Sequence, residues 1–482
     1  MTDARFTVEG GSALVISGRG PRPRAVELVG ARARARAVMT GRGTTWRATI
    51  ALRAARWGGP QLPLPAGDYE LRIDAGDAVD VSEPAPVALV QLGTLRASLT
   101  GWTVTVGPPI DPAYDSGEGQ DALERRYAGR VGTLENAVFF ESFYGRNAGC
   151  NPLAIDRELA RVAPAVTRYW SVVDLSVAVP DGAVAVVEGS PEWWRARGAA
   201  RLLVVNDWLR RRFVRRPGQI VVQTWHGTPL KRLALHRPGF DPRRWAAVVR
   251  ESRRWNVLLA QNPYGARILS KAYAFLTRPV WVEGYPRNDV LTTGDAEATR
   301  AALGVSASDR VVLYAPTWRD DRREMVDFVD PVQLAHDLDA VVLVRGHSRT
   351  LLPGKDAEGP RVVDVTGFPD TSALLLAADA LVTDYSSVMF DFSVTGKPMF
   401  FLVPDLEHFR GELRGFYFDL AEHAPGPVVR SQDELVAAFA AHDPAVHEER
   451  YRLWRARFNA RDDGHAAERV VARILDQGFV ER

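Results

Sequence analysis

Polar side chains stand directly after four apolar runs of this 482-residue sequence. They belong to the segments His226-Gly-Thr-Pro229, Thr317-Trp-Arg319, Arg345-Gly-His347 and Thr383-Asp-Tyr-Ser386-Ser387. A neutral imidazole accepts a proton near pH 7, so both histidines are candidates for acid–base chemistry. Arginine, serine and threonine side chains donate hydrogen bonds to anions. The pattern predicts a polar crevice for an anionic ligand, most simply a diphosphate.

The elements that must position these segments are apolar runs that alternate with longer helical patterns. One set is Ala137–Phe140, Ala183–Val187, Leu202–Val205, Ile220–Thr224, Val257–Ala260 and Val280–Glu283. A second set is Val311–Ala315, Ala340–Val344, Arg361–Val365, Ala380–Thr383 and Met399–Val403. Continuous apolar strands between helices are typical of parallel sheets covered on both faces. Ligands of such sheets bind outside the carboxyl ends of the strands, so we expect the four polar segments to face one crevice.

The chain divides by pattern into three parts and a connection. Residues 1–110 carry short alternating runs separated by turns that contain Gly and Pro, which predicts a small all-β N-terminal domain. Residues 111–128 have the composition of a linker. A break near residues 292–308 separates two doubly wound α/β domains, 129–300 and 301–482.

Composition excludes several classes of protein. The formal net charge is +2, whereas nucleic-acid binders usually carry a strong basic excess. The single cysteine, Cys150, excludes an internal disulfide framework and any multi-cysteine metal site, and nothing marks it as a nucleophile. No apolar run is long enough to span a bilayer and no signal sequence opens the chain. We therefore expect a cytoplasmic protein.

Two basic segments have two interpretations each. Residues 19–56 contain ten arginines and one acid, and Arg210–Arg216 contains five arginines. Both are typical of solvated surfaces. Both would also attract an anionic membrane surface or a polyanionic chain.

Other motifs of nucleotide and metal chemistry are missing or misplaced. No Walker loop and no Gly-x-Gly-x-x-Gly turn follows any predicted strand. Asp337-Leu-Asp339 has the form of a metal-binding Asp-x-Asp, but it precedes its strand and so falls at the amino end. We predict no metal site and no tightly bound cofactor.

Taken together, roughly residues 130–470 resemble the CDP-glycerol glycerophosphotransferase family, the enzymes that prime and polymerise poly(glycerol phosphate) teichoic acids. The matching segments are Phe140–Gly145 with Asn151-Pro152, Gln223–Lys231, Gly284–Asp289, Tyr314–Arg319, Ala378–Phe392 with Gly396-Lys-Pro398, Gly415–Asp419 with Pro425-Gly-Pro427, and Asp463-Gly464. Ser348 departs from the family pattern, because such enzymes usually carry proline directly after the histidine that is His347 here.

The resemblance implies a GT-B architecture, in which two Rossmann-like domains face each other and the C-terminal one holds the donor nucleotide. It implies that His226 is the catalytic base and that His347, Ser386 and Ser387 contact the pyrophosphate. Donor-side contacts are expected from Thr317, Arg319, Arg345 and Thr383 as well. The acceptor-side residues that we expect are Glu141, Gly227, Thr228, Arg287, Asn288 and Asp289.

The implied reaction is attack of an acceptor hydroxyl on the phosphorus next to glycerol in CDP-glycerol, with release of CMP. The acceptor is expected to be a lipid-linked or polyanionic glycerol-phosphate polymer, with the enzyme peripheral on the inner face of the cell membrane. Three alternatives stay open: a CDP-ribitol donor, a GT-B glycosyltransferase that uses a nucleotide-sugar, and a non-catalytic polymer-binding scaffold.

Overall fold

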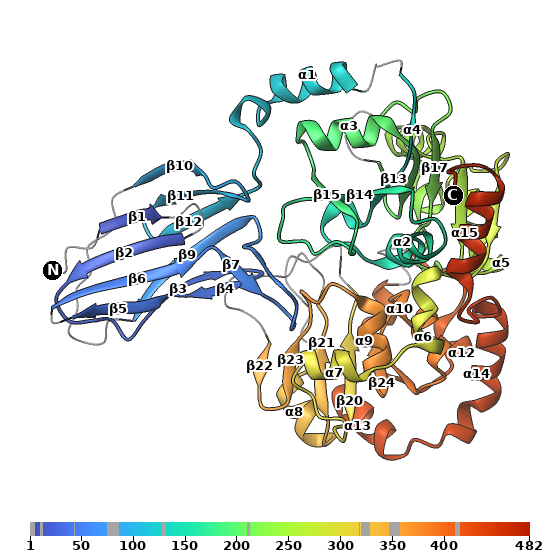
Figure 1. Ribbon diagram of the computed structural model, residues 1–482. Coiled ribbons are helices and arrows are strands. Elements are labelled where there is room, and N and C mark those ends of the chain that lie inside the picture. The colour runs from blue at the N-terminus through green and yellow to red at the C-terminus, as the bar shows by residue number, and fades with distance from the viewer. Residues whose placement is uncertain are drawn as a thin grey trace.

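A computed structural model gives the fold of residues 5–9, 13–42, 44–74, 86–127, 132–209, 213–317, 319, 328–346, 357–409 and 415–482. Figure 1 shows a β-rich part, drawn in blue, beside two α/β units that lie one above the other. His347 lies outside the described residues, and so do Ser348 and Arg210–Arg212 of the second basic segment.

The β-rich part consists of antiparallel strands. They are β1 (Arg5–Glu9), β2 (Ala13–Arg19), β3 (Ala25–Gly30), β4 (Arg34–Arg36), β5 (Val38–Arg42), β6 (Thr45–Ala51), β7 (Arg53–Ala55), β8 (Gln61–Pro63), β9 (Gly67–Asp74), β10 (Val87–Gln91), β11 (Arg96–Thr100) and β12 (Thr103–Gly107). Two sheets have the orders β1-β2-β6-β5 and β10-β11-β12-β9-β3-β4, and β7 pairs with β8 alone. Alternating residues of both sheets, such as Ile16, Ile50, Leu28 and Leu71, form one shared core.

The first α/β unit contains a seven-stranded parallel sheet. Its strands are β13 (Glu135–Glu141), β14 (Thr167–Val172), β15 (Val184–Val187), β16 (Ala200–Val205), β17 (Ile220–Gln223), β18 (Val257–Ala260) and β19 (Val280–Val282), in the order β15-β14-β13-β16-β17-β18-β19. Phe139 and Phe140 of β13 lie in separate cores on its two faces. The helices are α2 (Cys150–Val162), α3 (Pro191–Ala199), α4 (Pro242–Ser252) and α5 (Pro263–Ala272). Helix α6 (Val290–Thr293) follows them in the chain and packs in the core of the second unit through Leu291.

The second α/β unit has the same order in its parallel strands, apart from one added strand at an edge. Its sheet has the order β22-β23-β21-β20-β24-β25-β26, with strands β20 (Val311–Ala315), β21 (Val341–Val344), β22 (Glu358–Gly359), β23 (Val362–Asp364), β24 (Ala380–Thr383), β25 (Met399–Leu402) and β26 (Val428–Val429). Only the short edge strand β22 runs antiparallel. The helices are α7 (Glu297–Ala302), α8 (Pro331–Asp337), α9 (Thr371–Ala377), α10 (Val388–Phe392), α11 (Leu406–His408), α12 (Leu420–His423), α13 (Gln432–Ala440) and α14 (Pro444–Phe458). The predicted parallel α/β architecture is confirmed.

Two segments differ from the predicted division of the chain. Within residues 111–128, Gly117–Tyr127 forms helix α1, because Leu123 is buried in a core of the first α/β unit and Gln120 accepts a hydrogen bond from Trp194. At the other end, helix α15 (Ala466–Asp476) packs against α2 through Val470 and Ile474. The chain therefore returns from the second unit to the first, and residues 466–480 pack with the first.

Candidate active site

His226 lies just beyond the carboxyl end of β17, as predicted. Its Nδ1 lies 2.6 Å from the backbone oxygen of Asn206. A carbonyl oxygen only accepts hydrogen bonds, so Nδ1 carries the proton of the neutral ring and Nε2 keeps its lone pair. The ring stacks on Trp225 with centroids 4.8 Å apart, and Phe143 approaches from another side at 5.5 Å. The imidazole is thus held in the tautomer that a general base requires.

Burial lowers the pKa of His226 below its usual value of 6.5. Asp207 and the bond to Asn206 oppose this shift, and the positive charge of Arg287 adds to it. The net direction keeps the ring neutral at pH 7, because only the charged form pays the desolvation cost. The ring is therefore available to accept a proton.

The backbone around His226 adopts unusual conformations. Trp225, Phe143, Tyr144 and Cys150 all have positive φ angles, from 46° to 61°, although none is glycine. Such residues cost about 1–3 kcal/mol each and persist only where the surroundings enforce them. Asn151 supplies part of this enforcement, since its Nδ2 lies 3.2 Å from the carbonyl of Trp225.

Asn206 holds the same region from the opposite side. Its Oδ1 accepts from the amide of Phe143 at 2.8 Å, and its Nδ2 donates to the hydroxyl of Ser142. Sequence reasoning missed Asn206 because it follows β16 alone, outside any motif. One signal could have found it: Asn206 follows β16, and the strand order of the sheet reverses between β13 and β16, where ligands bind in such sheets.

The two α/β units meet directly beside His226. A side chain at Gly227 would place its Cβ 2.5 Å from the Oγ of Ser387, so only glycine allows this approach. Farther along the same segment, Arg232 donates its amide to Gly415 and Leu230 accepts from the amide of Tyr417. Two of the predicted site segments, far apart in the sequence, are thus in contact.

A buried ion pair also joins the two units. Nη2 of Arg287 lies 2.6 Å from Oδ2 of Asp391 on α10, and Asn288 donates to the other carboxylate oxygen at 3.0 Å. Burial alone would lower the pKa of Arg287, but Asp391 together with Cys150 and Tyr285 outweighs burial and raises that pKa, so the guanidinium stays charged. Asp391 is a second residue that sequence reasoning missed.

The other acceptor-side candidates bond to the protein itself. Asp289 caps α15, because its carboxylate accepts from the amides of Ala466 and Ala467 at 2.9 and 2.8 Å. The hydroxyl of Thr228 donates to Gln261 at 2.6 Å. Glu141 accepts from Ser171 at 2.8 Å. These contacts position the site segments, and contact of these residues with an acceptor stays a prediction.

On the donor side, three hydroxyls lie at the strand ends as predicted. The amide of Thr317 donates to Asp384, while its Oγ1 is buried and has no hydrogen-bond partner among the described residues. Ser387 occupies the N-cap position of α10 without a side-chain cap bond, and the Oγ of Ser386 makes only a long 3.4 Å contact with Val388. These hydroxyls are able to bond to a ligand.

Three other donor-side candidates do not have this freedom. Arg319 is buried, with Nε and Nη2 bonded to Asp405 and Nη1 bonded to Asp384 and to the carbonyl of Thr317. Thr383 donates its hydroxyl to the carbonyl of Ala315 at 2.7 Å. Through these contacts both residues tie strand ends together, and their contact with a donor stays a prediction.

Arg345 is the third of these candidates. It donates to the carbonyls of Val365 and Phe368 and to the hydroxyl of Thr371. Burial lowers its pKa to about 10, so it is still charged at pH 7. No carboxylate among the described residues lies within ion-pair distance of it, although Asp370 and Asp364 act on its charge from farther away. Its contact with a donor stays a prediction.

The basic segment and a nearby hollow also have structural explanations. Arg215 bonds to Asn256 at 2.6 Å, and Arg216 bonds to the carbonyls of Gly198 and Gly132, so these two side chains are not a free charged surface.

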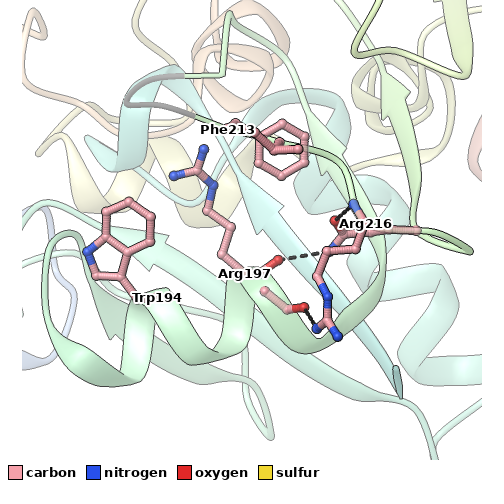
Figure 2. A pocket seen from close by; sticks show the side chains of 7 residues that line it. Trp194, Arg197, Phe213 and Arg216 are labelled. Atoms are coloured by element: carbon pink, nitrogen blue, oxygen red, sulfur yellow. Dashed lines mark hydrogen bonds between the residues drawn. The ribbon is translucent and has the colours of Figure 1, made fainter. Parts of the chain in front are cut away.

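Figure 2 shows a small hollow lined by Arg197, Phe213, Arg216 and Trp194. None of the predicted site residues lines it. In the described parts of the chain, no group of His, Cys, Asp and Glu is arranged to hold a metal ion.

Two doubly wound units in contact through loops after their strands define a class of α/β proteins that bind ligands between domains. The chain belongs to the CDP-glycerol:poly(glycerophosphate) glycerophosphotransferase family, whose profile matches residues 126–476. It is 34% identical to the teichoic acid glycerol-phosphate transferase of Staphylococcus aureus (strain NCTC 8325 / PS 47), over 71% of this chain and 93% of that protein.

Two further relatives are polymerases. The teichoic acid poly(glycerol phosphate) polymerase of Bacillus subtilis (strain 168) is 36% identical over 64% of this chain, a match that spans only 44% of that polymerase. A structure of the wall teichoic acid polymerase TagF soaked with CDPG superposes with a TM-score of 0.68 at 29% identity, covering 75% of this chain and 94% of that one. The predicted family resemblance is confirmed.

Proposed function

We propose that this protein transfers glycerol phosphate from CDP-glycerol to a hydroxyl group of a glycerol-phosphate acceptor and releases CMP. The main observation behind this proposal is that His226, fixed as a neutral base, directly precedes Gly227, which lies against Ser387 of the other unit. Family membership supports the choice of donor. We further propose a GT-B division into residues 129–300 and 301–482, with residues 466–480 returning to the first domain, behind an N-terminal all-β domain of residues 1–110.

In the proposed reaction, Nε2 of His226 takes the proton of the acceptor hydroxyl. The hydroxyl oxygen then attacks the phosphorus next to glycerol, and the bond from that phosphorus to the bridging oxygen breaks. CMP leaves with that oxygen and its electron pair. The hydroxyls of Thr317, Ser386 and Ser387 and the positive charge of Arg345 stabilise the negative charge that develops. His347 stays a predicted partner in this role.

The test follows CMP release by the purified chain. A lipid-linked glycerol-phosphate primer is supplied with CDP-glycerol, CDP-ribitol or a UDP-sugar in parallel reactions. We expect CMP release with CDP-glycerol and a longer polymer as product. Faster turnover of CDP-ribitol or release of UDP would contradict the donor assignment. CDP binding without any turnover would favour the scaffold alternative.

We also propose that the chain binds the surface of an anionic membrane. No helix in the described residues is long and apolar enough to cross a bilayer. Near the start of α4, however, Phe240 is 83% exposed and Trp245 is 50% exposed, and both are followed by exposed arginines, Arg243 and Arg250. Exposed aromatic residues next to cations are typical of interfacial helices.

Vesicle sedimentation tests this membrane contact. Anionic vesicles should retain the wild-type protein at low salt, and the double variant Phe240→Ser/Trp245→Ser should lose most of that binding. Leu453→Ser is the matched control, because Leu453 is 54% exposed on the distant helix α14. Equal binding by all three proteins would overturn the assignment of this surface.

A further inference from the structure

The hairpin β7–β8 extends from the β-rich part to both α/β units. Figure 1 shows β7 at the side of the β-rich part that faces them. Its turn contains Trp57 and Gly58, with φ angles of 55° and 68°, and closes with a bond from the amide of Gly59 to the carbonyl of Arg56. This turn lies outside the family match, which begins at residue 126. Relatives' properties therefore do not explain it.

One side of the hairpin contacts the first α/β unit. Arg56 donates to the carbonyl of Ser176 at 2.9 Å. Just beyond β8, the amide of Ala66 donates to the buried carboxylate of Asp174 at 2.8 Å. Both partners lie in the loop after β14, at the carboxyl edge of the first sheet. The hairpin is thus anchored by hydrogen bonds on this side.

The tip of the hairpin contacts the second unit through an aromatic residue. Trp57 packs edge-on against Phe368 with ring centroids 5.4 Å apart and joins the apolar cluster of that unit. Gly58 lies beside Ala302 at the end of α7. Phe368 belongs to the loop 365–371, which joins β23 to α9 and ends on Thr371, the first residue of that helix.

The loop 365–371 supports the end of β21, where the donor side begins. Arg345 donates to the carbonyls of Val365 and Phe368 at 3.0 and 3.1 Å. The amide of the next residue, Gly346, donates to the hydroxyl of Thr366 at 2.8 Å. The positions of Trp57 and of the backbone after β21 are therefore linked through a single short loop.

We propose that the hairpin β7–β8 braces the donor side of the active site and that Trp57 is a positioning residue for it. Trp57 fixes Phe368, the loop 365–371 fixes Arg345 and Gly346, and the charge of Arg345 is thereby held in place for the donor phosphates. This role rests on the proposed function for its substrate. Its structural part, the ordering of loop 365–371 by Trp57, does not depend on any reaction.

The experiment compares Trp57→Ala with wild type by hydrogen exchange and by kinetics. In the full chain, amide exchange in residues 362–371 should become faster in Trp57→Ala while β13 and β16 stay protected. The KM for CDP-glycerol should rise about five- to tenfold, as expected for loss of an aromatic pair, with kcat within about twofold. Trp57→Phe should restore most of both properties. Unchanged exchange and unchanged KM in Trp57→Ala would overturn the proposal.

Two further variants keep the outcome decisive. Gln61→Ala alters an exposed residue of the same hairpin and should match wild type in both measurements. Phe368→Ala removes the other half of the pair, so adding Trp57→Ala to it should cause little further change in exchange; additive effects would count against the brace. If wild type releases no CMP, the proposed function fails, whereas the exchange comparison still decides whether Trp57 orders the loop.

Discussion

The two α/β units share a strand order but place different chemistry at the point where that order reverses. In the first unit, the loops after β16 and β17 hold one imidazole between a carbonyl and an aromatic ring. In the second unit, the loops after β20 and β24 present hydroxyls beside buried arginines. The topology therefore fixes where a ligand meets the sheet, and the residues at the strand ends fix what happens to it.

The units also differ in how their site segments are held. At His226, two non-glycine residues with positive φ angles, Trp225 and Phe143, lie against the ring. On the donor side, Arg319 instead ties three loops together by bonding to Asp405, Asp384 and Thr317. One half is held by backbone conformation and amide side chains, and the other by a buried charge network.

The largest expected effect follows from removing the base in the first unit. His226→Ala should lower kcat by about 10²–10⁴-fold, the usual range for a positioned general base, with little change in the affinity for CDP. CMP release measures the rate and calorimetry measures the affinity. His336→Ala, which alters an exposed histidine on α8, should behave as wild type. A His226→Ala variant with normal turnover would remove the distinction between the two units.

The ion pair that joins the units is expected to dominate stability. Asp391→Asn leaves the Arg287 guanidinium buried beside an amide and should lower the free energy of unfolding by about 3–5 kcal/mol. Urea denaturation measures this loss. The exposed pair of Glu449 and Arg452 provides the control, since Glu449→Gln should leave the urea midpoint unchanged. Equal effects of the two variants would show that the units are held together elsewhere.

A smaller effect is expected on the donor side. Ser387→Ala removes one hydroxyl at the contact with Gly227 and should raise the KM for CDP-glycerol about three- to tenfold, the value of about one ordinary hydrogen bond. Thr383→Val is the comparison, because that hydroxyl is already bonded to Ala315. A rise in KM for Thr383→Val without one for Ser387→Ala would reverse the assignment of the two hydroxyls.

Sequence reasoning located the strands and their ends well because both depend on local pattern. The apolar runs 257–260 and 311–315 became strands with the predicted bounds, and the run 202–205 lies within the longer strand β16. The partners of the side chains depend on the tertiary fold instead. Asp405 lies 86 residues beyond Arg319, so no spacing in the sequence reveals that it takes up the guanidinium. Helix α1 escaped prediction because its glycines and polar residues resemble a linker until Leu123 is buried.

The smallest expected effect concerns the pH at which His226 of the first unit becomes protonated and can no longer act as a base. Because burial lowers the pKa of His226, the ring is neutral at pH 6.5 and above, and activity falls only as pH drops through the lowered value. The negative charge of Asp207 partly opposes this shift and keeps the pKa from falling further. Asp207→Asn should therefore move the acidic limb of the kcat profile to lower pH, whereas Asp339→Asn on the exposed surface should leave it in place. A shift toward higher pH would mean that another group controls this limb.

The contribution of the neutral ring to the free energy of unfolding has the same sign. It is present above pH 6.5 and is lost on acidification, since the unfolded chain then binds the proton more readily.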